Sequence, residues 1–130
     1  MQMTLFLRRV LLLDAASCLG MGLGLVAGAA VLAGPLGLPA ILLSGAGIAL
    51  IPIGLFMAFV AARAAPPAIL VWLVVLGNVA WVAKSLAVIA LFPTISALGI
   101  VFVAGQAAFV AAIASLEYSG LRRATAPAVA

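Results

Sequence analysis

Only 6% of the 130 residues are charged and 69% are hydrophobic, which gives a mean hydropathy of +1.52. A soluble domain carries about 25% charged residues, so this composition excludes an ordinary water-soluble protein. The net charge of +4 comes from six basic and two acidic residues. Their positions indicate membrane topology and not a surface that binds nucleic acid.

Four apolar segments, each about 20 residues or longer, fill most of the chain: residues 10–33, 41–62, 68–91 and 95–116. A helix rises about 1.5 Å per residue, so each segment is long enough to cross a hydrocarbon core about 30 Å thick. The sequence therefore predicts an all-α polytopic membrane protein, with one four-helix domain over residues 1–123. Residues 124–130 are predicted to form a frayed tail.

The connections between these segments are short, which predicts antiparallel neighbours in an up-down-up-down bundle. Basic residues occur before the first segment, between the second and third, and after the fourth: Arg8, Arg9, Arg63, Arg122 and Arg123. The other two connections carry no charge. Because cytoplasmic loops are enriched in Lys and Arg, this pattern predicts that both termini are cytoplasmic.

The first segment carries Gly20, Gly24 and Gly28 at steps of four residues, which places them on one helix face. Small residues at this spacing allow another helix backbone to approach closely. Two interpretations remain open, packing within the bundle and a seam between copies of the chain. Cys18 lies in the same segment and is expected to serve packing alone.

Asp14 and Lys84 are charged residues inside the predicted spans, where charges are costly and are candidates for function. Asp14 is expected to reach toward the headgroups, the nearby arginines or Trp72. Alternatively, it is a protonatable site for ion or drug coupling. The depths of Asp14 and Lys84 in the membrane differ by roughly 18 Å at 1.5 Å per residue, so the two charges are not expected to pair.

Lys84 is predicted to face the bundle interior, an oligomer interface or a hydrated vestibule. Its side chain leans toward the start of its helix and away from the nearer membrane surface. No acidic residue in the outer half of the membrane is available to neutralise it. Lys84, Asp14 and Trp81 are therefore the candidate contacts for a partner or ligand.

Asn78 and Gln106 fall at similar depth in consecutive segments, and we expect a hydrogen bond between them that joins the third and fourth helices. Trp81 and Ser85 lie near the same face and are expected to extend this network. Glu117 is expected at the cytoplasmic boundary, in an ion pair with Arg122 or Arg123.

The sequence has no histidine, one cysteine and two carboxylate side chains. Haem, zinc and copper sites are built from such ligands, so we expect no metal and no cofactor. No glycine-rich nucleotide-binding loop is found either. We therefore do not expect an enzyme.

The stretches LLLDAAS, GLP, VVLGNVAW and LEYSGLRR follow one another along the chain. In this layout the sequence resembles small four-helix inner-membrane proteins of bacteria whose activities are not assigned. The chain length and the acidic Asp14 in the first helix are also similar to the small multidrug resistance transporters. The first resemblance implies a bacterial inner-membrane location, and the second implies transport by an oligomer.

The leading functional hypothesis is a non-catalytic accessory or assembly subunit that contacts the lipid bilayer and binds other membrane helices or copies of itself. The scarcity of polar residues supports it. The alternative is a small oligomeric transporter or ion-coupled exporter that uses Asp14 or Lys84. Four helices enclose little space, so transport would require at least a dimer.

Overall fold

The computed structural model describes residues 1–126, which form four helices: α1 (Leu5–Leu36), α2 (Ala40–Ala62), α3 (Ala68–Leu91) and α4 (Ala97–Thr125). Each helix is long and apolar enough to span a membrane. With 32 residues in α1 and 29 in α4, these two helices are longer than the hydrocarbon core requires. Their ends therefore extend to the headgroup region or the helices tilt.

Local capping explains why α1 and α4 differ from the ranges expected from hydropathy. Thr4 accepts a hydrogen bond from the Leu7 amide at 3.1 Å, which starts α1 five residues before residue 10. Ser96 accepts from the Gly99 amide at 2.9 Å and starts α4 at Ala97. The fourth helix then continues through Arg122 and Arg123 to Thr125, beyond the expected end at residue 116. Of the expected frayed tail, residues 127–130 lie outside the described part.

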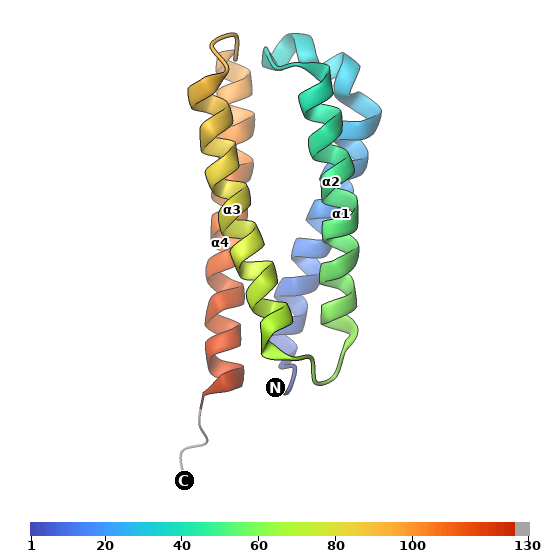
Figure 1. Ribbon diagram of the computed structural model, residues 1–130, viewed down its shortest axis with the longest axis vertical. Helices are drawn as coiled ribbons and strands as arrows, with labels where there is room; N and C mark the ends of the chain where they lie inside the picture. Colours follow the sequence, from blue (N-terminus) through green and yellow to red (C-terminus); the bar gives the residue numbers. More distant parts are fainter. Residues whose placement is uncertain (127–130) are drawn as a thin grey trace.

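The helices pack as two hairpins, α1 with α2 and α3 with α4 (Figure 1). The hairpins meet mainly through α1 and α4. Helices α2 and α3 scarcely touch. The start of α1, the connection between α2 and α3, and the end of α4 all lie at one end of the bundle (Figure 1).

We call this the arginine end, because Arg8, Arg9, Arg63, Arg122 and Arg123 lie in or beside these segments. Arg8 Nη2 donates to the Arg63 carbonyl at 3.5 Å. Three of the guanidinium groups lie over aromatic rings: Arg63 over Phe59, Arg122 over Tyr118 and Arg123 over Phe6, at 5.4–5.8 Å from the ring centres. The described residues form no salt bridge.

We call the opposite end the Gly37 end. Gly37 has φ +65°, a left-handed conformation that ends α1, and a Cβ here would collide with the Thr94 carbonyl. The Ser96 amide donates to the Leu36 carbonyl at 3.0 Å, and the Thr94 hydroxyl donates to the Gly37 carbonyl at 3.0 Å. These bonds join the end of α1 to the start of α4. Pro35, expected in the connection, lies within the last turn of α1.

Helices α1 and α2 approach each other backbone to backbone at Gly22 and Gly47. A Cβ on Gly47 would lie 2.7 Å from the Gly22 carbonyl oxygen, so only glycine fits there. By contrast, a Cβ on Gly20 or Gly24 would meet nothing within 4 Å, and one on Gly28 would meet only Leu32 of its own helix. The expected glycine face therefore does not pack this bundle. The other interpretation, in which Gly20, Gly24 and Gly28 form a contact between copies of the chain, stays a prediction.

Candidate functional site

Three helices meet at a buried polar junction formed by Asp14 of α1, Asn78 of α3 and Glu117 of α4. Asn78 Nδ2 donates to Asp14 Oδ2 at 2.7 Å and to Glu117 Oε1 at 3.0 Å. An amide group has two N–H donors, so one nitrogen serves both acceptors. The exposed fractions of Asp14 and Glu117 are 1% and 0%. The junction therefore links the two hairpins within the interior of the bundle.

This junction corrects three expectations. Asp14 turns inward and contacts neither the arginines nor Trp72, because α3 presents Asn78 to it. Asn78 bonds to the two carboxyl groups and not to Gln106. Glu117 is buried and makes no ion pair with Arg122 or Arg123, because helix α4 continues past it and turns its side chain toward α1.

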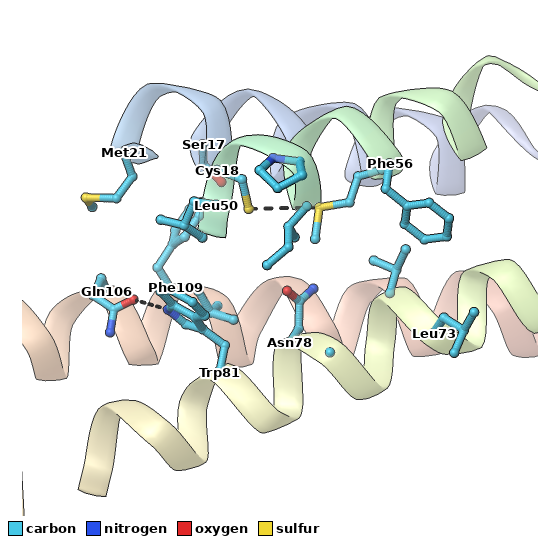
Figure 2. Close-up of a pocket in the computed structure, with 16 residues that line it drawn as sticks. Ser17, Cys18, Met21, Leu50, Phe56, Leu73, Asn78, Trp81, Gln106 and Phe109 are labelled. Carbon is cyan, nitrogen blue, oxygen red and sulfur yellow. Dashed lines mark hydrogen bonds between the residues drawn. The ribbon is translucent and has the colours of Figure 1, made fainter. Parts of the chain in front are cut away.

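Cys18 lies one turn after Asp14 on α1 and is buried, in agreement with a packing role. Its Sγ lies 3.7 Å from Asp14 Oδ1 and 3.9 Å from the Met57 sulfur on α2. The second contact is drawn in Figure 2. All four helices therefore contribute a side chain at or beside the junction.

A second polar network joins α3 to α4 nearer the Gly37 end. Trp81 Nε1 donates to Gln106 Oε1 at 3.0 Å, and Gln106 Nε2 donates to the Ser85 hydroxyl at 2.7 Å. Ser85 in turn donates to the Trp81 carbonyl at 2.8 Å. The expected link between α3 and α4 through Gln106 is present, with Trp81 and not Asn78 as its partner. Figure 2 shows the indole of Trp81 directed at Gln106.

Two cavities of about 350 Å³ each lie between the hairpins, where α2 and α3 stay apart. Both are lined by residues from all four helices. The inner cavity, nearer the arginine end, has Cys18 and Asn78 in its wall and is otherwise largely apolar (Figure 2). Met21, Trp81 and Gln106 line both cavities, so the second network lies where they adjoin.

The outer cavity, nearer the Gly37 end, has Lys84 in its wall. Lys84 is exposed, whereas Ser85 beside it is buried. Ile41 and Leu73, which line the outer and inner cavities, are 83% and 51% exposed. The cavities therefore open sideways from the bundle. We call this opening, with its two cavities, the α2–α3 groove.

Glu117 is the residue of this site that hydropathy places outside the membrane-spanning segment. It lies eleven residues after Gln106, which is about three helical turns, so both side chains share one face of α4. That spacing would have placed Glu117 in the interior once the helix was extended to Thr125. Apolar composition ends at Leu116, and hydropathy alone therefore puts Glu117 outside the span.

The described residues contain no group of three or more His, Cys, Asp or Glu side chains placed to hold a metal ion. Asp14 and Glu117 lie behind the cavity walls and do not line them. The polar side chains that line the groove carry amide, indole, hydroxyl, thiol and amine groups, which suit hydrogen bonding and charge pairing. The site is therefore suited to binding.

Four apolar helices of this length define a multi-pass membrane protein that contacts the lipid bilayer. Comparison with known proteins finds no matching family model, no matching curated protein and no matching solved structure.

Proposed function

We propose that this chain is a non-catalytic accessory or assembly subunit that binds a transmembrane helix of another membrane protein in the α2–α3 groove. The observation that supports it is the unneutralised charge of Lys84 at the edge of this apolar groove. The proposal includes an up-down-up-down topology with the arginine end in the cytoplasm, in a bacterial inner membrane.

Neither of the chain's two acidic side chains neutralises Lys84. Asp14 and Glu117 are its two acidic side chains, and both are buried at the junction with Asn78. A second copy of the chain brings the same two buried acids, so a homo-oligomer does not supply the missing charge either. The neutralising group therefore comes from a different molecule.

The position of Lys84 favours a protein carboxylate over a lipid phosphate. Lys84 lies seven residues before Leu91 at the end of α3, roughly 10 Å below that end at 1.5 Å per residue. Its side chain leans toward the start of the helix, away from the nearer headgroups. A partner helix with an Asp or Glu at this depth neutralises Lys84 while its apolar side chains fill the two cavities.

The test is purification of the tagged full chain in mild detergent, with co-purified proteins identified by mass spectrometry. We expect a discrete subunit whose transmembrane helix carries an Asp or Glu in its outer half. Its recovery should fall at least tenfold with Lys84→Met and be retained with Lys84→Arg. Exposed Ala83 of α3 does not line the groove, so Ala83→Met is the matched control and should change nothing.

Changing the partner's carboxylate to its amide should release the subunit as Lys84→Met does. Equal recovery with the wild type and Lys84→Met would contradict the proposal. A partner without an intramembrane carboxylate would also contradict the proposal, since no group on it would neutralise Lys84.

A second candidate is a small oligomeric transporter, and the inner cavity is the observation that favours it. This cavity is lined by Trp81, Phe56 and Phe109 and reaches Asn78, which holds Asp14. An apolar, aromatic space beside a buried acid suits a hydrophobic cation. Transport in vesicles that is lost with Asp14→Asn, from a chain that purifies only with itself, would favour this function over the first.

A further inference from the structure

The junction poses a charge problem that exists whether or not a partner helix occupies the groove. Asp14 and Glu117 approach one amide nitrogen at 2.7 and 3.0 Å, so the two bonded carboxyl oxygens lie no more than 5.7 Å apart. Both side chains are buried away from solvent. Two negative charges at this spacing in a medium of low polarity repel strongly and lose their hydration.

No positive group offsets these charges. From α1, the other titratable side chain at the junction is the Cys18 thiol, which is neutral or negative and never positive. From α2 and α3, the neighbouring side chains are Met57 and Asn78, and neither titrates. On α4, Tyr118 follows Glu117 but is 40% exposed and packs on Trp72. No lysine or arginine in the described residues forms an ion pair with either carboxyl group.

One atom at the junction has no partner. Glu117 Oε2 is buried and accepts no hydrogen bond, although Oε1 of the same carboxyl group is bonded to Asn78. Burying a carboxylate oxygen without a donor is costly, because its lost hydration is not replaced. A proton between the two carboxyl groups removes both difficulties, since it neutralises one charge and turns an acceptor into a donor.

We propose that Asp14 and Glu117 form a proton-binding site that holds one exchangeable proton between them. One carboxyl group is then a neutral acid that donates to the other, and Asn78 donates to both. The inner cavity supplies the path for exchange, since Asn78 and Cys18 lie in its wall and also contact the carboxyl groups (Figure 2). Because the site joins α1 to α3 and α4, loss of the proton restores repulsion between the hairpins.

Infrared spectroscopy of the purified full chain in lipid tests the proton directly. With only two acidic side chains, labelling aspartate or glutamate with ¹³C assigns each carboxyl band to one residue. At neutral pH we expect one protonated side-chain carboxyl and one carboxylate per chain. At alkaline pH the protonated band should disappear with release of one proton. The Asp14→Asn/Glu117→Gln double variant should show neither band.

Two carboxylates at neutral pH would overturn the proposal. Two protonated carboxyl groups that persist through the alkaline range would also overturn it. Loss of the protonated band on addition of Na⁺ at constant pH would identify a site for a monovalent cation instead and would equally count against it.

Thermal unfolding across pH provides a second readout that does not depend on band assignment. If the folded chain holds a proton that the unfolded chain does not, its stability falls as pH rises from neutral to alkaline. The unfolding equilibrium changes by at most tenfold per pH unit for one proton. The isosteric double variant should show no such slope. Equal slopes for the wild type and the double variant would contradict the proposal.

Discussion

Gly22 of α1 and Gly47 of α2 bring their two backbones into direct contact, with a Cβ on Gly22 lying 2.9 Å from the Gly47 carbonyl oxygen. The reciprocal Cβ on Gly47 would lie 2.7 Å from the Gly22 carbonyl. Close van der Waals packing drives helix association in membranes, where lipid is as apolar as the helices. This pair therefore sets how closely the first hairpin packs.

We predict that Gly22→Ala destabilises the protein by about 1–3 kcal/mol, because the added methyl group must separate two backbones. Gly24→Ala should be neutral or slightly stabilising, since its Cβ meets nothing within 4 Å and alanine favours helix. Thermal unfolding in one detergent compares the two variants. If Gly24→Ala instead proved the more damaging, residue 24 would lie at a contact between copies of the chain.

The glycines also show what a sequence can predict about this bundle. Hydropathy located all four helices, because span length depends only on the thickness of the membrane. The choice between Gly22 and Gly24 as the contact depends on the rotation of α1 against α2. Gly22 and Leu25, which face α2, are as apolar as the residues that face lipid. The sequence therefore carries no amphipathic pattern that would reveal the rotation of α1 relative to α2.

The polar residues were predictable as a set but not in their pairing. Asp14, Asn78, Gln106 and Lys84 are conspicuous in an apolar chain, and their positions along the helices predict different depths for Asp14 and Lys84. The partner of Asn78 depends on which face of α3 meets α1. The face of α3 that meets α1 depends on how the two hairpins dock through α1 and α4. This docking is a long-range feature that local residue spacing does not encode.

We predict that Asn78→Leu lowers stability, because Asp14 Oδ2 and Glu117 Oε1 each lose their amide donor inside the bundle. A buried polar group left without its partner costs about 1–3 kcal/mol. Val79→Leu on the exposed face of α3 is the matched control and should have little effect. Thermal unfolding measures both variants, and equal melting temperatures would show that Asn78 does not hold the junction together.

The bond between Trp81 and Gln106 should contribute a measurable coupling between α3 and α4. Trp81→Phe removes the indole donor, and Gln106→Leu removes the acceptor together with the donor to Ser85. Interhelical hydrogen bonds in membranes average about 0.6 kcal/mol and reach about 1.7. A double-mutant cycle on unfolding free energies should return a coupling in that range. A coupling indistinguishable from zero would mean that the two side chains do not interact in the membrane.

The structure also provides labelling sites for the orientation of the bundle in the membrane. Gly37 is unsuitable, because its φ of +65° and the adjacent Thr94 carbonyl exclude a side chain. Ala40 at the start of α2 and Ala65 between α2 and α3 are exposed, small and at opposite ends of the bundle. The native Cys18 is buried and is replaced by alanine in both variants.

We predict that a membrane-impermeant thiol reagent added to intact cells labels the Ala40→Cys variant and leaves the Ala65→Cys variant unlabelled. The reason is the gathering of Arg8, Arg63 and Arg122 at the Ala65 end, which positive-inside insertion holds in the cytoplasm. Permeabilised cells should label both variants, which controls for accessibility. Labelling of Ala65→Cys alone would reverse the orientation. Equal labelling of both in intact cells would mean that the chain inserts in two orientations, despite its arginines.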